Sequence, residues 1–110
     1  MEEPEIRYIG IKDMDDFEKS ELTSLVEKGY ATLKKKAKLK EAQLVISIKK
    51  TSKTGGRHNY RIILKLNAAG TKKAWFDVRH EDWELARVVH RCFDALTTLM
   101  QHELKRQFRK

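Results

Sequence analysis

Apolar and polar residues alternate over three stretches in the middle of the chain. Leu44, Ile46 and Ile48 alternate with more polar positions such as Ser47 and Lys49. The same alternation recurs over 60–66 and 74–78, where the apolar positions are Tyr60, Ile62, Leu64, Leu66, Ala74, Phe76 and Val78. A period of two predicts strands with one buried face. The connecting segments, a basic hairpin loop at 50–59 and a tighter turn at 67–71, favour antiparallel pairing.

Two longer segments follow a period near 3.6 residues, which predicts helices. The first follows a short strand over 6–11 and opens at Asp13, Asp15 and Asp16, whose carboxylates suit the first turn of a helix. Its apolar positions are Phe17, Leu22, Leu25, Val26, Gly29, Leu33 and Ala37. The second runs from about 82 to the end, with Leu85, Val89, Cys92, Phe93, Leu96, Leu99, Met100 and Leu104 on one face. At about 1.5 Å per residue it spans about 40 Å, so its last turns, 105–110, should project past the sheet.

The predicted order is strand, helix, three strands, helix, a βαβββα chain of the α+β class forming one domain over 1–110. A single core closes only if both helices cover the same face of a four-stranded sheet. The other face is then open to solvent, and the alternation places Lys49, Arg61, Lys65 and Asp77 on it. Val45 and Ile63 share that face and depart from its polar pattern.

Charge is distributed unevenly along the 110 residues. The chain has 24 Lys and Arg against 16 Asp and Glu, a net charge of +8 with a pI near 9.7. Residues 1–30 hold nine acids and four bases, a net of −5, so residues 31–110 carry +13. Such a basic segment favours a polyanionic partner. With 40% hydrophobic residues and one proline, the composition excludes a disordered basic tail, and the length excludes a multi-domain enzyme.

The setting that the sequence predicts is cytoplasmic. The longest apolar runs have three residues, as at 44–46, far short of the roughly 20 that span a bilayer. The acidic start of the chain is unlike a signal peptide, and the single cysteine, Cys92, cannot form an internal disulfide. We therefore expect no membrane association.

Candidates for catalysis or metal binding are weak. The histidines are scattered and lack zinc-site spacing, and Cys92 falls in an apolar helical stripe, where a thiol serves as a small hydrophobe. Gly55–Gly56 lacks the rest of a phosphate-binding loop, and helix capping accounts for the aspartates better than a calcium loop does. We expect no enzymatic activity, no cofactor, no metal and no small-molecule substrate.

Basic residues instead gather on the two helices. Lys34, Lys35 and Lys38 lie on the exposed side of the first helix's end, and a stripe of the second helix carries Arg87, Arg91, His102, Lys105 and Arg109. If the helices pack side by side, both sets could flank one groove for phosphates; the alternative is that they are simply solvated faces. Aromatic residues such as Trp75 and Trp83 are better suited to the core or its rim than to a stacking platform. Recognition of structured RNA by backbone and shape is therefore favoured.

The arrangement resembles the short form of the hibernation-promoting factor and ribosome-associated inhibitor family. The resemblance rests on the element order and on three segments: 6–10 (IRYIG), 42–50 (AQLVISIKK) and 81–83 (EDW). It covers nearly the whole chain and implies a factor that binds the small ribosomal subunit at its decoding region and represses translation. It also implies that basic residues of both helices meet ribosomal RNA. The matching positions are Lys34, Lys35, Lys38, Arg87, Arg91, Lys105, Arg106 and Arg109.

Two other classes of protein stay open. A double-stranded RNA-binding domain also has two helices on one face of three antiparallel strands, although it begins with a helix and this chain begins with a strand. A basic protein-interaction module would use the same charge to meet an acidic protein. The expected partner remains ribosomal RNA of the small subunit, and the expected oligomeric state is a monomer or a weak dimer.

Overall fold

A computed structural model describes residues 6–37, 42–52, 56, 58–68 and 75–108, with the side chains at 52, 68 and 104–108 outside that description. The strands are β1 (Ile6–Ile9), β2 (Ala42–Ser52), β3 (His58–Ala68) and β4 (Trp75–Asp82). A short 3-10 turn, η1 (Ile11–Asp13), precedes helix α1 (Asp16–Ala37), and helix α2 (Leu85–Phe108) follows β4. The α+β class and the βαβββα order are therefore confirmed.

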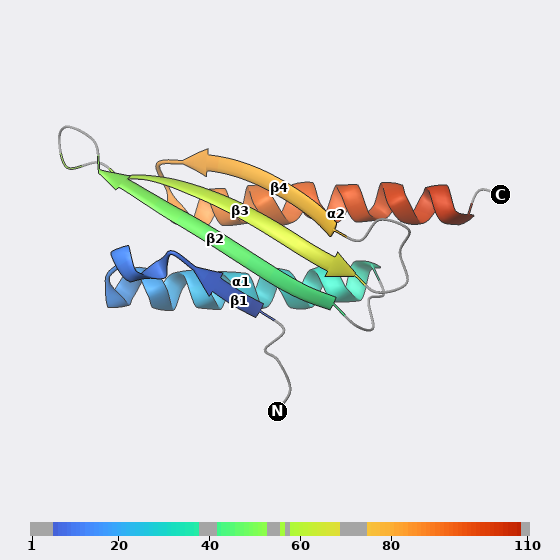
Figure 1. Ribbon diagram of the computed structural model, residues 1–110, viewed down its shortest axis with the longest axis horizontal. Coiled ribbons are helices and arrows are strands. Elements are labelled where there is room, and N and C mark those ends of the chain that lie inside the picture. The colour runs from blue at the N-terminus through green and yellow to red at the C-terminus, as the bar shows by residue number, and fades with distance from the viewer. Residues whose placement is uncertain (1–5, 38–41, 53–55, 57, 69–74, 109–110) are drawn as a thin grey trace, which may run out of the picture.

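The four strands form one mixed sheet in the order β1-β2-β3-β4 (Figure 1). β1 pairs with β2 in parallel, and the β2–β3 and β3–β4 pairs are antiparallel, as the connections predicted. Leu44 lies opposite Leu66, and Leu66 opposite Phe76, so the even-numbered residues of all three long strands share one face. That face is the apolar face of the alternation.

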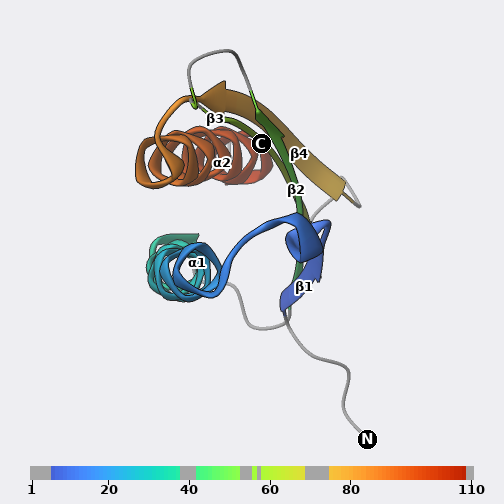
Figure 2. The same ribbon diagram turned by 90° about the vertical axis from the view of Figure 1, so that its left-hand side faces the viewer.

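Both helices cover that same face of the sheet (Figure 2). They contact each other and run in the same direction, and α2 extends beyond the sheet at its C-terminal end, as its length predicted (Figure 1). The core lies between the two layers. Its fully buried side chains include Leu22, Val26 and Leu33 of α1, Ile46, Ile62 and Leu64 of the sheet, and Val88, Leu96 and Met100 of α2.

Gly29 permits the close approach of the two helices. A Cβ at this position would lie 2.6 Å from the ring of Phe93, which is itself buried. No real side chain tolerates that distance, so the Phe93 ring packs directly on the backbone of α1. Gly29 therefore belongs to the helix contact, and its place in the predicted apolar stripe has a physical reason.

The predicted apolar faces need two corrections. Phe17 is 77% exposed and Leu99 is 38% exposed, so neither belongs to the core. In α1 the buried stripe runs through 18, 22, 26, 30, 33 and 37, which puts Phe17 about 100° away from it and buries Glu18 in its place. The side chain of Leu104 lies outside the described part of the chain.

The hairpin between β2 and β3 is tighter than predicted. Strand pairing continues to Ser52 opposite His58, so both ends of the predicted 50–59 loop belong to strands. Extra pairing satisfies backbone groups that a ten-residue loop would leave to water. Part of the predicted 67–71 turn and Ala74 lie outside the described residues.

Candidate nucleic-acid interface

A groove runs along the seam between α1 and α2, on the side away from the sheet. It encloses about 200 Å³. Its lining comes from both helices: Leu25, Lys28, Gly29, Thr32 and Lys36 from α1, and Val89, His90, Phe93, Asp94 and Thr97 from α2. The groove exists because Gly29 lets the helices lie close together while longer side chains stand on either side. The helices therefore lie side by side with a groove between them, but its lining holds neither of the two basic sets that the sequence suggested could flank a groove.

The bases of this groove are free to meet a ligand. Lys28 and Lys36 are exposed, and the described residues offer neither of them a hydrogen-bond or ion-pair partner. They stand two helical turns apart, about 12 Å along the axis. His90 faces them from α2, and Asp94 is the one acid of the lining. Two unpaired ammonium groups at this spacing suit the phosphates of a nucleic-acid backbone.

Two of the predicted lysines, Lys34 and Lys35, belong to α1 but do not line the groove. The Lys34 ammonium sits 5.4 Å from the centre of the Tyr30 ring, a cation–π contact that holds it partly buried. Lys35 is exposed and has no partner among the described residues. Lys38 lies outside the described residues. Whether these lysines bind RNA stays a prediction.

The predicted arginines of α2 are tied into ion pairs at the start of the helix. Arg87 lies 2.8 Å from Glu84 through Nη2 and Oε2, and 3.6 Å from Asp82. Arg91 Nη1 lies 3.3 Å from Asp82 Oδ2. Asp82, which is buried, also accepts a hydrogen bond from the Glu84 backbone N–H at 3.1 Å. These two arginines therefore share their charges with carboxylates of the same chain. Whether they bind RNA stays a prediction.

The pKa values reflect this pairing. The Glu84 N–H and the Arg87 guanidinium hold the pKa of Asp82 below its usual range, and Glu84 and Asp82 raise the pKa of Arg87. Both shifts favour the charged forms that make the ion pairs.

Two of the remaining predicted bases belong to the far end of α2. Lys105 and Arg106 lie in the part of the helix that projects past the sheet, with their side chains outside the described set, and Arg109 lies outside the described residues. Because the helices run in the same direction, this end of α2 lies on the same side of the molecule as the lysine-rich end of α1 (Figure 1). Their role also stays a prediction.

Lys28 and Lys36 were not singled out from the sequence. The sequence does hold a signal for them, which is the helical spacing of residues 25, 28, 29, 32 and 36. Residue 29 is a glycine, and a small residue in an apolar stripe marks the place where two helices touch. Residues that flank such a position on its solvent side line the seam between the helices.

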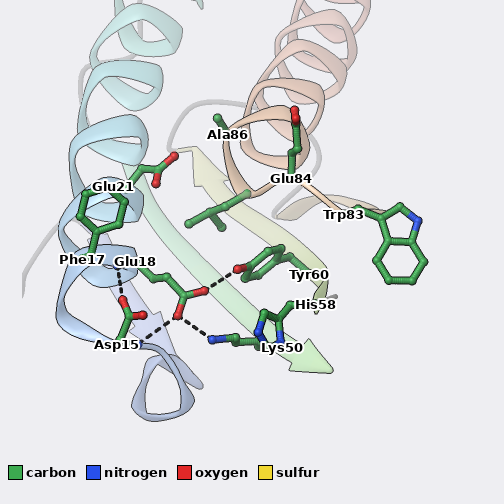
Figure 3. Close-up of a pocket in the computed structure, with 11 residues that line it drawn as sticks. Asp15, Phe17, Glu18, Glu21, Lys50, His58, Tyr60, Trp83, Glu84 and Ala86 are labelled. Carbon is green, nitrogen blue, oxygen red and sulfur yellow. Dashed lines mark hydrogen bonds and ion pairs between the residues drawn. The ribbon is translucent and has the colours of Figure 1, made fainter. Parts of the chain in front are cut away.

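A second cleft, of about 450 Å³, lies at the opposite end, near the first turns of both helices (Figure 3). Glu18 occupies its floor and accepts hydrogen bonds from the Tyr60 hydroxyl and, at 2.6 Å, from Lys50 Nζ. Glu18 and Asp15 also form a reciprocal capping box: the Glu18 N–H donates to Asp15 Oδ1 at 2.8 Å and the Asp15 N–H to Glu18 Oε1 at 3.1 Å. The aspartate predicted to cap α1 is therefore Asp15.

Burial alone would raise the pKa of Glu18, but the hydrogen bonds from Lys50, Tyr60 and Asp15 outweigh it and lower this pKa to about 2. Burial, together with the Glu18 charge, raises the pKa of Tyr60. Glu18 thus has hydrogen-bond partners in Lys50, Tyr60 and Asp15, and this network ties the start of α1 to β2 and β3.

The described residues show no metal site or membrane-spanning helix. No three His, Cys, Asp or Glu side chains among them are grouped so as to hold a metal ion. Neither described helix has the length and apolar composition for a bilayer crossing. Cys92 is fully buried, and burial raises the pKa of its thiol to about 12, in keeping with its predicted place in the core.

Comparison with known proteins identifies the fold. No family model matches the sequence, and no curated protein matches it. Among solved structures, the N-terminal domain of Thermus thermophilus Protein Y is similar to the chain, with a TM-score of 0.57 and 18% sequence identity. The match covers 93% of this chain and 98% of that domain. The likeness therefore extends over the whole βαβββα arrangement.

Proposed function

We propose that this protein is a non-enzymatic, cytoplasmic ribosome-binding factor that contacts RNA of the small subunit through its paired helices. The observation that carries the proposal is the groove between α1 and α2 with Lys28 and Lys36 unpaired on its rim. Binding there would place an obstacle of one domain's size on the ribosomal RNA and repress translation by occlusion. This is the role that the sequence resemblance implies for the decoding region.

The fold supports this proposal from a second direction. Protein Y, whose N-terminal domain has this fold, is a protein of the hibernation-promoting factor family, the family that the sequence resembles. The residues of the sequence and the likeness of the fold thus both support a ribosome-associated role. Ribosomal RNA remains the polyanion proposed as the partner.

Co-sedimentation with ribosomal subunits at low salt tests the proposal. The unchanged chain should sediment with small subunits and dissociate steeply as salt rises. K28E/K36E should bind weakly and lower the salt slope by about 1.4–1.8, because each phosphate contact contributes about 0.7–0.9. The control is K12E/K19E, an equal charge reversal at η1 and the first turns of α1, outside the groove lining. No sedimentation of the unchanged chain at low salt, or equal losses in both variants, would refute the proposal.

The same variants separate the ribosomal role from generic binding of duplex RNA. A double-stranded RNA-binding protein should shift any RNA duplex in a gel as readily as it binds subunits. A ribosomal factor should prefer the subunit when both compete at the same salt concentration. Equal competition by generic duplex would favour the alternative.

A further inference from the structure

The face of the sheet opposite the helices is uncovered by any described element (Figure 2). We call it the open face; it consists of the odd-numbered residues of the four strands. The strand register places Val45 between Arg7 and Lys65, with Asp77 next along the same row. The next row carries Arg79. Neighbouring strands lie about 4.8 Å apart, so these side chains form one continuous surface.

A hollow of about 480 Å³ lies on this face, lined by Val45, Lys65, Trp75 and Asp77. The volume falls in the roughly 300–1,000 Å³ range of small-ligand sites. Trp75 is 44% exposed, so one part of the indole is anchored and another meets solvent. Trp75 lies opposite Asn67 in the β3–β4 pairing. This pair is two positions along the strands from the Lys65–Asp77 pair, and the pair between them faces the core. The hollow thus combines an aromatic surface with an ammonium group and a carboxylate.

The charge of the open face selects an anionic ligand. Its bases are Arg7, Lys49, Arg61, Lys65 and Arg79, and its acids are Asp77 and Glu81, a net of +3. Only Arg61 is paired among the described residues, with Glu81 at 3.5 Å, and both partners are half exposed. Such a pair contributes little and opens readily. The other four bases have no partner in the described part of the chain.

We infer that the open face is a second RNA-binding surface, which takes a short single-stranded segment with one base stacked on Trp75. Lys65 and the other unpaired bases would meet the phosphates on either side, and Asp77 would accept a hydrogen bond from an amino group of the base. A single strand is favoured over a duplex because only an unstacked base can offer its face to an indole. The exposed Trp75 thus provides a stacking surface that the sequence did not predict. This surface lies opposite the helix groove, so the inference goes beyond the proposed function.

Two tryptophans make the inference directly testable. In W83F, Trp75 is the only tryptophan, and short oligoadenylate should quench its fluorescence. In W75F, the tryptophan fluorescence comes from Trp83 alone. This fluorescence should not be quenched, although the oligonucleotide still binds by stacking on the phenyl ring that replaces the indole. Quenching of equal size in both variants, or none in W83F, would overturn the inference.

Binding of labelled oligoadenylate, followed by fluorescence anisotropy, gives the affinities. W75A and K65E should each weaken binding roughly ten-fold, in line with the loss of one stacked base or one phosphate contact, while W75F should retain most of it. K12E supplies the matched charge reversal outside the open face and should have a small effect. Unaltered thermal unfolding of W75A would show that the loss is not one of folding. Equal loss of oligoadenylate affinity in K12E and K65E would overturn the inference. Displacement of the oligonucleotide by polyglutamate of equal charge would also overturn it, and would indicate an acidic protein as the partner.

K28E/K36E keeps the two proposals apart. Introduced into the W83F chain, this double substitution should leave oligoadenylate quenching unchanged, because the helix groove lies on the other side of the sheet. Oligonucleotide binding therefore tests the proposal for the open face alone. Co-sedimentation with ribosomal subunits tests the proposal for the helix groove.

Discussion

Charged side chains at the two ends of the helix pair behave in opposite ways. Near the first turns of α1 and α2, Glu18 is held by Lys50 and Tyr60, and Asp82 by Arg87 and Arg91. Along the groove farther down the helices, Lys28 and Lys36 have no partner among the described residues. The ion pairs of the first end join elements of the fold, whereas the lysines of the groove have no such role within the described chain and are the ones that we propose to bind RNA. Basic residues therefore differ in function according to the carboxylates that the fold brings to them.

Replacing Lys50 with methionine should produce the largest effect, because it breaks the paired end. Glu18 would keep its burial and lose one charge-assisted hydrogen bond of 2.6 Å. We expect the free energy of unfolding to fall by about 2 kcal/mol. The matched substitution K36M removes an unpaired lysine and should change it by less than about 0.5 kcal/mol. Urea unfolding of both variants measures the difference.

The double variant K50M/E18Q completes this test. Removing both charges relieves the buried carboxylate, so its loss of stability should be smaller than the sum of the two single losses. If K50M and K36M proved equally stable, the distinction between a paired end and an unpaired groove would be wrong.

Acid should weaken the paired end next. The pKa of Glu18 is about 2 in the folded chain against a usual value of 4.5, so its ionised form is favoured by folding. Stability from this group is complete above pH 4.5 and is lost as pH falls toward 2. After allowance for solvent screening, the loss amounts to about 1–2 kcal/mol. E18Q should flatten the dependence of stability on pH across this window, as thermal unfolding at a series of pH values would show. A dependence identical to that of the unchanged chain would contradict the assignment.

The sequence predicted the sheet better than the helices. Alternation fixes the inward face of a strand because a shift of one residue would turn every side chain to the other side. The apolar stripe of a helix is broader, and the pattern placed Phe17 in it. In the structure Phe17 is exposed, and the next residue, Glu18, is buried. The burial of Glu18 depends on Lys50 and Tyr60, which are more than 30 residues away in the chain. Local patterns carry no information about such partners.

The candidate site shows the same limit. The sequence predicted correctly that both helices would cover the same face of the sheet. It left open whether they share a groove, and the rotational phase at which the helices meet decides which lysines line it. That phase follows from Gly29 meeting Phe93. The ion pair of Arg87 with Glu84 can be predicted from the sequence, because the two residues are three apart. The ion pair of Arg91 with Asp82 cannot, because Asp82 lies at the end of a strand, where helical spacing does not apply.

The smallest expected effect is also the one that bears most directly on binding. D82N keeps an oxygen that can accept the Glu84 N–H bond and removes the charge that holds Arg91 and part of Arg87. If the pairing withholds these arginines from RNA, D82N should bind small subunits a few-fold more tightly, and its salt slope should steepen by up to about 1.8, the value for two added phosphate contacts. The double variant D82N/R91Q should return toward the original slope. Sedimentation across a salt series measures both. An unchanged slope in D82N would mean that ion pairing does not decide which bases reach RNA, and the contrast between the two ends would then apply to stability alone.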